Sequence, residues 1–197
     1  MNLEQTENLA TTVKAAREGD LAAFESLLRF FEGRVFGYVL RIVGNREDAE
    51  DITQDIFIKV YKKFGSYDEE QSFKTWLFAI ATHAAYDFLR KKRVKPELLI
   101  ISDPDRSFET ADTTDTYIQI ETGHDIRAAL ATLRPAYQSV LTLFYMEGLS
   151  VEEVARALGA PIGTVKTHLA RARSAIKDVL QGPVEPGNFS NENLYEN

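Results

Sequence analysis

Cysteine is absent from the 197-residue chain. Its absence excludes disulfide bonds, thiolate nucleophiles and cysteine-ligated metal sites together. Glycine and proline are scarce as well, with 11 and 6 residues respectively. Because both residues interrupt helices, their scarcity beside long amphipathic runs favours an all-helical fold.

Long apolar runs are also missing from the sequence. No stretch approaches the roughly 20 apolar residues that a bilayer-spanning helix needs. The opening residues, MNLEQTENLATTVKAAREGD, show no basic segment followed by an apolar block, which a targeting signal would have. We therefore expect a cytoplasmic protein without direct membrane insertion.

Basic residues are fewer than acidic ones, and the formal net charge is −7. This balance argues against indiscriminate coating of nucleic acid, but it permits DNA binding where bases are concentrated locally. The chain shows no nucleophile–base constellation and no phosphate-cradling glycine loop. Its histidines, His83, His124 and His168, are too scattered for a metal site. We expect neither an enzyme nor a bound cofactor or metal.

The amphipathic runs fall into two blocks, which predict two small helical domains joined by a flexible acidic linker. The first block begins after Asp20, and Asn45 and Ser72 precede its later amphipathic stretches as candidate N-caps. Helical periodicity fades in the connector, where acids are frequent and Arg106 is the only base. The expected division is an N-terminal extension 1–19, a domain 20–95, a linker 96–125, a domain 126–181 and a mobile tail 182–197.

The stretch SVEEVARALGAPIGTVKTHLARARSAIK predicts a helix-turn-helix in the second domain. Ser150 and Glu153 match a capping box, which marks a helix start. Gly159 stands where a left-handed residue ends a helix, and Pro161 can open the next one. Both predicted helices carry an apolar inner face.

The outer face of the second helix concentrates hydroxyl and basic side chains. Hydroxyls and a guanidinium can read base edges in the major groove, while flanking cations meet phosphates. An ordinary solvated helix face is the alternative, but the agreement of cap, turn glycine and apolar faces favours DNA binding. The predicted DNA-binding residues are Lys166, Thr167, His168, Arg171, Arg173 and Ser174.

Two longer stretches resemble a known family. They are DAEDITQDIFIKVYKKFGSYDEEQSFKTWLFAIATHAAYDFLRKKR and ATLRPAYQSVLTLFYMEGLSVEEVARALGAPIGTVKTHLARARSAIK. Their order and the strings D-x-x-Q-D-x-F, F-x-T-W-L and G-T-V-K-x-H-x-x-R-A-R resemble bacterial sigma factors of the extracytoplasmic-function (ECF) group. The resemblance covers most of residues 20–180. It implies an RNA polymerase subunit that recognises minus-ten and minus-thirty-five promoter elements and promotes DNA melting.

The resemblance also implies roles for residues of the first block. Docking on the coiled coil of the largest polymerase subunit is implied for Asp48, Asp51, Gln54, Asp55 and Ile58, although a solvated acidic face is the common meaning of such a cluster. Aromatic and cationic side chains suit an extruded base and a single strand. The implied minus-ten residues are Tyr67, Trp76, His83, Tyr86, Arg90, Lys92 and Arg93. For Trp76, packing in the core is an equal alternative.

Two other classes of function also fit parts of the sequence. TVKTHL also resembles the helix-turn-helix of response regulators, but their receiver domain needs alternating strands and helices, which the first block does not show. A third interpretation is that the first block is a helical bundle used only for protein interaction. Tyr67, Trp76 and the basic cluster at 90–93 argue against it. The resemblance further implies an anti-sigma partner wedged between the domains, which a flexible linker would allow.

Overall fold

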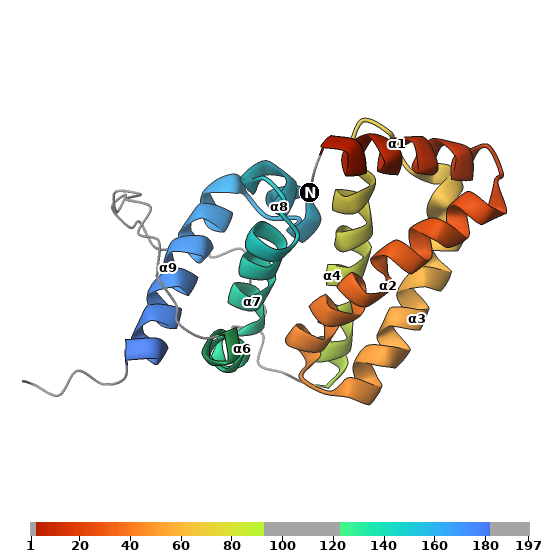
Figure 1. The fold of residues 1–197 in the computed structure, drawn as a ribbon. Coiled ribbons are helices and arrows are strands. Elements are labelled where there is room, and N and C mark those ends of the chain that lie inside the picture. Colours follow the sequence, from red (N-terminus) through yellow and green to blue (C-terminus); the bar gives the residue numbers. More distant parts are fainter. Residues whose placement is uncertain (1–2, 93–122, 182–197) are drawn as a thin grey trace, which may run out of the picture.

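The computed structural model describes residues 3–92 and 123–181, and every regular element in these ranges is helical. The N-terminal bundle comprises α1 (Leu3–Arg17), α2 (Leu21–Val43), α3 (Arg46–Lys63) and α4 (Phe73–Lys91). The C-terminal domain comprises α6 (Gly123–Thr132), α7 (Pro135–Leu141), α8 (Val151–Leu158) and α9 (Ile162–Gln181), as Figure 1 shows. Short turns, one 3₁₀ (Phe64–Ser66) and one π-helical (Thr142–Met146), complete these elements. The all-helical prediction is confirmed for the described residues.

The three helix starts predicted in the first block are confirmed. The Asp20 carboxylate accepts the N–H groups of Ala22 and Ala23 at 2.9 and 3.0 Å. Asn45 caps α3 and Ser72 caps α4 in the same manner, each through its side-chain oxygen. Each cap satisfies donors that the first helical turn leaves without an intrahelical partner.

The core of the N-terminal bundle lies around α2, which contacts α1, α3 and α4. Phe31, Val35 and Tyr38 of α2 are fully buried. Thr82 donates its hydroxyl to the Phe78 carbonyl, so the Tyr38 hydroxyl donates to Thr82, at 2.7 Å. Burial raises the pKa of Tyr38 to about 12, which keeps this buried hydroxyl neutral.

The helix-turn-helix forms as predicted. Ser150 and Glu153 make a reciprocal capping box at the start of α8. Gly159 ends α8 with φ at 62°, a left-handed conformation that costs glycine little. The domain begins earlier than predicted, because α6 starts at Gly123, inside the expected linker. Most of that linker, the predicted tail and Arg93 lie outside the described residues.

The two domains contact each other directly. Helix α8 packs on α4, and α7 packs on α2. Helices α3 and α9 lie on opposite outer sides of the molecule, with the contacting helices between them (Figure 1). The arrangement therefore leaves the outer faces of α3 and α9 away from the interdomain contact. No helix within 3–92 or 123–181 is long and apolar enough to cross a membrane.

Candidate nucleic-acid interface

The second helix of the helix-turn-helix, α9, presents a polar outer face. Lys166 and Ser174 are exposed, while Thr167, Arg171 and Arg173 are half-buried. Thr167 donates its hydroxyl to the Gly163 carbonyl at 2.9 Å, which fixes its rotamer. Lys166 and Ser174 are open to solvent, and Thr167, Arg171 and Arg173 are partly open, so a helix placed in the major groove could bring all five to DNA.

The prediction for His168 is wrong. Its side chain is only 1% exposed, and its ring forms a T-shaped contact with the Tyr137 ring at a centroid distance of 5.5 Å. The physical reason is helical spacing: position 168 follows Val165 by three residues and shares the inner stripe with Leu169 and Ala172. His168 packs in the core of the C-terminal domain and does not reach the polar outer face of α9.

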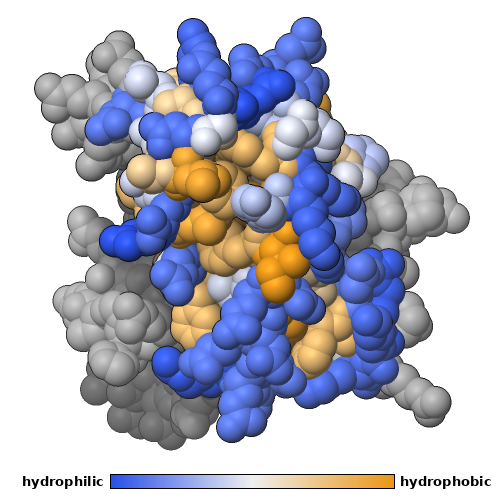
Figure 2. Space-filling model, turned by 90° about the vertical axis from the view of Figure 1, so that its right-hand side faces the viewer, coloured by the Kyte–Doolittle hydropathy of each residue, from blue (hydrophilic) through white to orange (hydrophobic). Residues whose placement is uncertain are grey.

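The predicted docking residues lie on the outer side of α3. Asp51, Gln54, Asp55 and Ile58 are exposed, and Ile58 is 52% exposed despite its apolar side chain. Figure 2 shows the side of the molecule that carries α3, where hydrophobic surface in the middle of the face is bordered by hydrophilic side chains. An exposed apolar residue beside carboxylates suits a partner that offers both apolar and basic groups.

Asp48 stands apart from the other docking residues. It is partly buried and forms an ion pair with Lys92, at 2.7 Å between the carboxylate and the ammonium. The pair joins the start of α3 to the end of α4. Asp48 and Lys92, predicted for two different surfaces, thus contact each other.

Tyr67 and Trp76 belong to an aromatic cluster. Tyr67 is 5% exposed, and its ring centroid lies 5.2 Å from that of Trp76 and 5.7 Å from that of Phe73. Its hydroxyl donates to the Gln71 carbonyl at 2.6 Å. The ring of Tyr67 is therefore covered in this arrangement, and its predicted role at the minus-ten element stays a prediction. Trp76 is partly buried against the same cluster, which agrees with the core-packing alternative.

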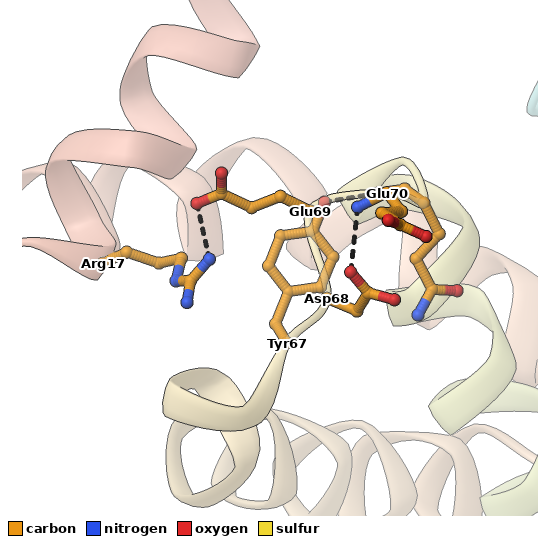
Figure 3. Close-up of polar contacts among 6 residues, drawn as sticks. Arg17, Tyr67, Asp68, Glu69 and Glu70 are labelled. Atoms are coloured by element: carbon orange, nitrogen blue, oxygen red, sulfur yellow. Dashed lines mark hydrogen bonds and ion pairs between the residues drawn. The ribbon is translucent and has the colours of Figure 1, made fainter.

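The loop that follows Tyr67 is tied to α1 (Figure 3). Arg17, in the last turn of α1, forms an ion pair with Glu69. Asp68 accepts the backbone N–H of Glu70 at 3.0 Å and shapes the turn. Burial and the Glu69 carboxylate raise the pKa of Tyr67, against the opposing effect of Arg17. No local pattern pointed to Arg17, because its contact with Glu69 joins positions far apart in the chain.

Tyr86 is also covered in this arrangement, and its role at the minus-ten element stays a prediction. It is 6% exposed, and its hydroxyl lies 2.9 Å from that of Ser139 on α7. Ser139 donates to the Pro135 carbonyl, so Tyr86 donates to Ser139. Burial raises the pKa of Tyr86 far above its ordinary value. The C-terminal domain thus covers this part of α4.

The remaining minus-ten residues of α4 are accessible. The exposed His83 holds its Nδ1 at 2.7 Å from the Ala79 carbonyl oxygen. Arg90 is exposed and forms an ion pair with Asp87 at 2.9 Å. Arg90 and Lys92 place two exposed cations at the end of α4, each paired with a carboxylate, while Arg93 lies outside the described residues.

Four charged residues meet between the domains, and we call them the interdomain cluster: Arg34, Lys74, Glu147 and Glu153. Arg34 pairs with the Glu147 carboxylate at 2.6 Å, and the Lys74 ammonium donates to the Glu147 backbone carbonyl. Glu153 accepts the hydroxyls of Ser72 and Thr75, at 3.1 and 3.2 Å. Sequence reasoning found only Glu153, as a helix cap, since contacts across 70 or more residues leave no local pattern.

The cluster perturbs two ionisable groups. Burial, with the nearby Arg34 charge, lowers the pKa of Lys74, against the opposing effects of Glu147 and Glu153. For Glu153, burial alone would raise the pKa of the carboxyl. Hydrogen bonds from the Ser150 backbone N–H and from the Ser72 and Thr75 hydroxyls outweigh burial, so its pKa is lowered. The lowered pKa favours the carboxylate form of Glu153, which accepts hydrogen bonds at the starts of both α4 and α8.

Comparison with known proteins gives the following matches. The model of Sigma-70 region 2 matches residues 27–94, and that of Sigma-70 region 4 matches residues 123–176. The ECF RNA polymerase sigma factor SigW of Bacillus subtilis is 31% identical over 179 residues, which are 86% of this chain and 95% of SigW. SigE of Mycolicibacterium smegmatis is 36% identical over 167 residues, which are 82% of this chain and 64% of SigE.

Solved structures give the same fold. The sigma factor RpoE from Bartonella quintana, in complex with the anti-sigma factor NepR, matches with a TM-score of 0.61 and 26% identity, over 81% of this chain and 98% of RpoE. CnrH, solved with the cytosolic domain of CnrY, matches with a TM-score of 0.60 and 21% identity, over 87% of this chain and 96% of CnrH.

Proposed function

Since the chain belongs to the ECF group of RNA polymerase sigma factors, we propose that it recruits core polymerase to promoters and promotes DNA melting there. The observation that carries the proposal is the match to SigW across 95% of that protein, with both sigma regions in order. The response-regulator alternative is not favoured, because the described first block is a helical bundle without strands. The role is one of binding rather than catalysis, and its place is the cytoplasm, where polymerase acts.

The C-terminal domain reads the minus-thirty-five element as duplex. Helix α9 brings Thr167, Arg171 and Ser174 to base edges, while Lys166 and Arg173 meet phosphates. Helix α9 packs on α7 and α8, so the reading helix is held by its own domain rather than by DNA. The support for these roles is exposure on one face of α9.

The N-terminal bundle binds polymerase and the minus-ten element. The exposed side chains Asp51, Gln54, Asp55 and Ile58 form the docking face for the coiled coil of the largest subunit. His83, Arg90 and Lys92 offer stacking and cationic contacts to the displaced strand. An anti-sigma protein is the expected regulatory partner, as in the complex of RpoE with NepR.

Reconstituted transcription tests the proposed function. The purified chain, mixed with bacterial core polymerase, is expected to give run-off transcripts from specific start sites on a random promoter library. Sequencing of the selected templates would return the two promoter elements. Transcripts no more frequent than those from core polymerase alone would refute the proposal.

Charge reversal at Asp51 is expected to weaken binding to core polymerase. Asp51→Arg replaces an exposed carboxylate on the docking face by a cation, which repels the basic groups that the proposal assigns to the partner. We expect the amount of chain recovered in a core-polymerase pull-down to fall about tenfold or more, which corresponds to at least ~1.4 kcal/mol.

The matched control is Glu25→Arg, the same charge change at an exposed position of α2, away from the docking residues. It is expected to leave recovery unchanged, and both variants are expected to keep the wild-type circular dichroism spectrum. Equal recovery of wild type and the Asp51 variant would place the docking face elsewhere.

A further inference from the structure

We propose that Arg17 is a positioning residue of the loop that precedes α4, and that it acts on the minus-ten strand through Glu69. The loop comprises residues 67–72, and we call it the acidic loop. Arg17 draws the Glu69 side chain back toward α1 and offsets its charge, so that the phosphates of a single strand can pass beside the loop. The inference rests on the proposed function and on the predicted place of Tyr67 at the minus-ten element.

Hydrogen bonds within the acidic loop hold its backbone in one shape. The Tyr67 hydroxyl donates to the Gln71 carbonyl at 2.6 Å and so joins the two ends of the turn. Between them, the Asp68 carboxylate accepts the backbone N–H of Glu70 at 3.0 Å. Glu69 lies between these contacts, with an exposed side chain that the turn itself does not engage. A partner outside the loop therefore decides where the Glu69 carboxylate lies.

Three consecutive carboxylates make the acidic loop unfavourable for nucleic acid. Asp68, Glu69 and Glu70 are all exposed. A single strand carries a negative phosphate at each nucleotide, so every carboxylate that faces the strand lowers its affinity. A loop beside the minus-ten element therefore needs a cation that offsets part of this charge.

Arg17 supplies such a cation from a well-supported helix end. It lies in the last turn of α1, where Val13 and Ala16 are buried at 7% exposed each. Helix α1 packs on α2, and Gly19, with φ at 98°, turns the chain directly into Asp20, the N-cap of α2. The negative end of the α1 dipole also favours positive charge at this place. The bundle thus holds Arg17 beside the acidic loop.

The ion pair draws Glu69 toward α1. The Glu69 side chain extends toward Arg17, whereas the Asp68 side chain does not (Figure 3). Burial and the Glu69 charge raise the pKa of Tyr67, while Arg17 lowers it, so both charges act on the same tyrosine. The side chains of Arg17 and Glu69 are 33% and 60% exposed, and a pair this open to solvent adds little to the free energy of unfolding. Its effect is therefore expected on the charge that a passing strand meets.

A purely structural tie is the alternative role for this pair. If the pair only anchors the loop, loss of either partner breaks the anchor, and both losses weaken strand binding. If Arg17 acts by offsetting Glu69, the two losses act in opposite directions. Removal of Arg17 frees a carboxylate to face the strand, whereas removal of Glu69 leaves an additional cation beside it. The direction of the effect at Glu69 separates the two roles.

Binding of a minus-ten single strand by the assembled holoenzyme measures these directions. The strand is taken from the selected promoters and labelled with a fluorophore, and each variant of the full chain is first bound to core polymerase. We expect Arg17→Gln to weaken binding about two- to fivefold and Glu69→Gln to strengthen it by a similar factor. The double variant, which restores the net charge, is expected to bind within about twofold of wild type.

The matched control is Arg29→Gln, which breaks an exposed ion pair with Glu25 on α2 that does not involve the acidic loop. It is expected to leave strand binding unchanged. All variants are expected to melt within ~2 °C of wild type, because exposed pairs contribute little to stability. Weaker binding after Glu69→Gln, or wild-type binding after Arg17→Gln, would overturn the proposal.

Quenching of Trp76 fluorescence tests the same charge effect without promoter DNA. Trp76 is the single tryptophan of the chain, and its ring centroid lies 5.2 Å from that of Tyr67. Iodide is an anion and stands in for phosphate, whereas acrylamide is a neutral quencher. At a constant ionic strength of ~0.1 M, we expect iodide quenching relative to acrylamide quenching to fall about 1.5-fold after Arg17→Gln and to rise similarly after Glu69→Gln.

The two measurements distinguish failure of this inference from failure of the proposed function. Absence of run-off transcription together with shifted iodide quenching would refute the proposed function and leave the charge effect of Arg17 standing. Unchanged iodide quenching in both variants overturns the role of Arg17, whether or not the chain supports transcription.

Discussion

Phe31→Ala is expected to destabilise the N-terminal bundle by ~3–5 kcal/mol, the cost of removing a buried aromatic ring and leaving a cavity. Phe31 is fully buried in α2 and forms T-shaped ring contacts with Phe30 and Phe73 at centroid distances of 4.9 and 5.5 Å. Helix α2 contacts the other three helices of the bundle, so surrounding side chains have little room to close the cavity. Urea denaturation followed by circular dichroism measures the change.

The adjacent residue provides the control. Phe30→Ala makes the same chemical change on the same helix at a side chain that is 46% exposed. Its expected cost is only ~1 kcal/mol, because about half of the ring is already in water. Similar losses of stability for the two variants would contradict the position of the core around α2.

Arg171→Ala is expected to weaken binding of the minus-thirty-five duplex by ~1–3 kcal/mol, which corresponds to roughly 5- to 150-fold in affinity. The reason is loss of a guanidinium that can pair with two acceptors on one base. Fluorescence anisotropy with specific and scrambled duplexes measures the change. We expect the loss to fall mainly on the specific duplex, so that discrimination between the two duplexes declines.

Lys166→Ala provides the contrast on the same helix. A lysine that meets phosphate should weaken specific and scrambled duplexes alike and reduce the salt dependence of binding by about one unit of slope. If Arg171→Ala and Lys166→Ala behave identically, Arg171 reads no base. If Arg171→Ala leaves affinity unchanged, Arg171 lies outside the contact set.

Local signals in the sequence predicted the helix starts and the helix-turn-helix correctly. Asp20, Asn45, Ser72 and Ser150 all cap the helices that their positions predict, because a cap depends on residues three or four positions away. The acidic residues of α3 were also expected on its surface, and Asp51 and Asp55 are exposed. Their role in docking stays a prediction.

Sequence patterns did not predict exposure where packing between distant segments decides it. His168 was placed on the DNA side, although its spacing from Val165 fits the buried stripe equally well. Tyr67 is covered by an aromatic cluster, and Tyr86 by a helix of the other domain. An aromatic residue in a helical pattern suits either a core or a binding surface, and only the tertiary arrangement separates the two.

The position of Arg34 and Lys74 has a consequence for the role of salt. Lys74 is buried in the interdomain cluster, and Arg34 is partly exposed beside it, where it pairs with the buried Glu147. Because salt screens buried pairs much less than exposed ones, this contact is expected to withstand an ionic strength that weakens an exposed pair such as Arg29–Glu25.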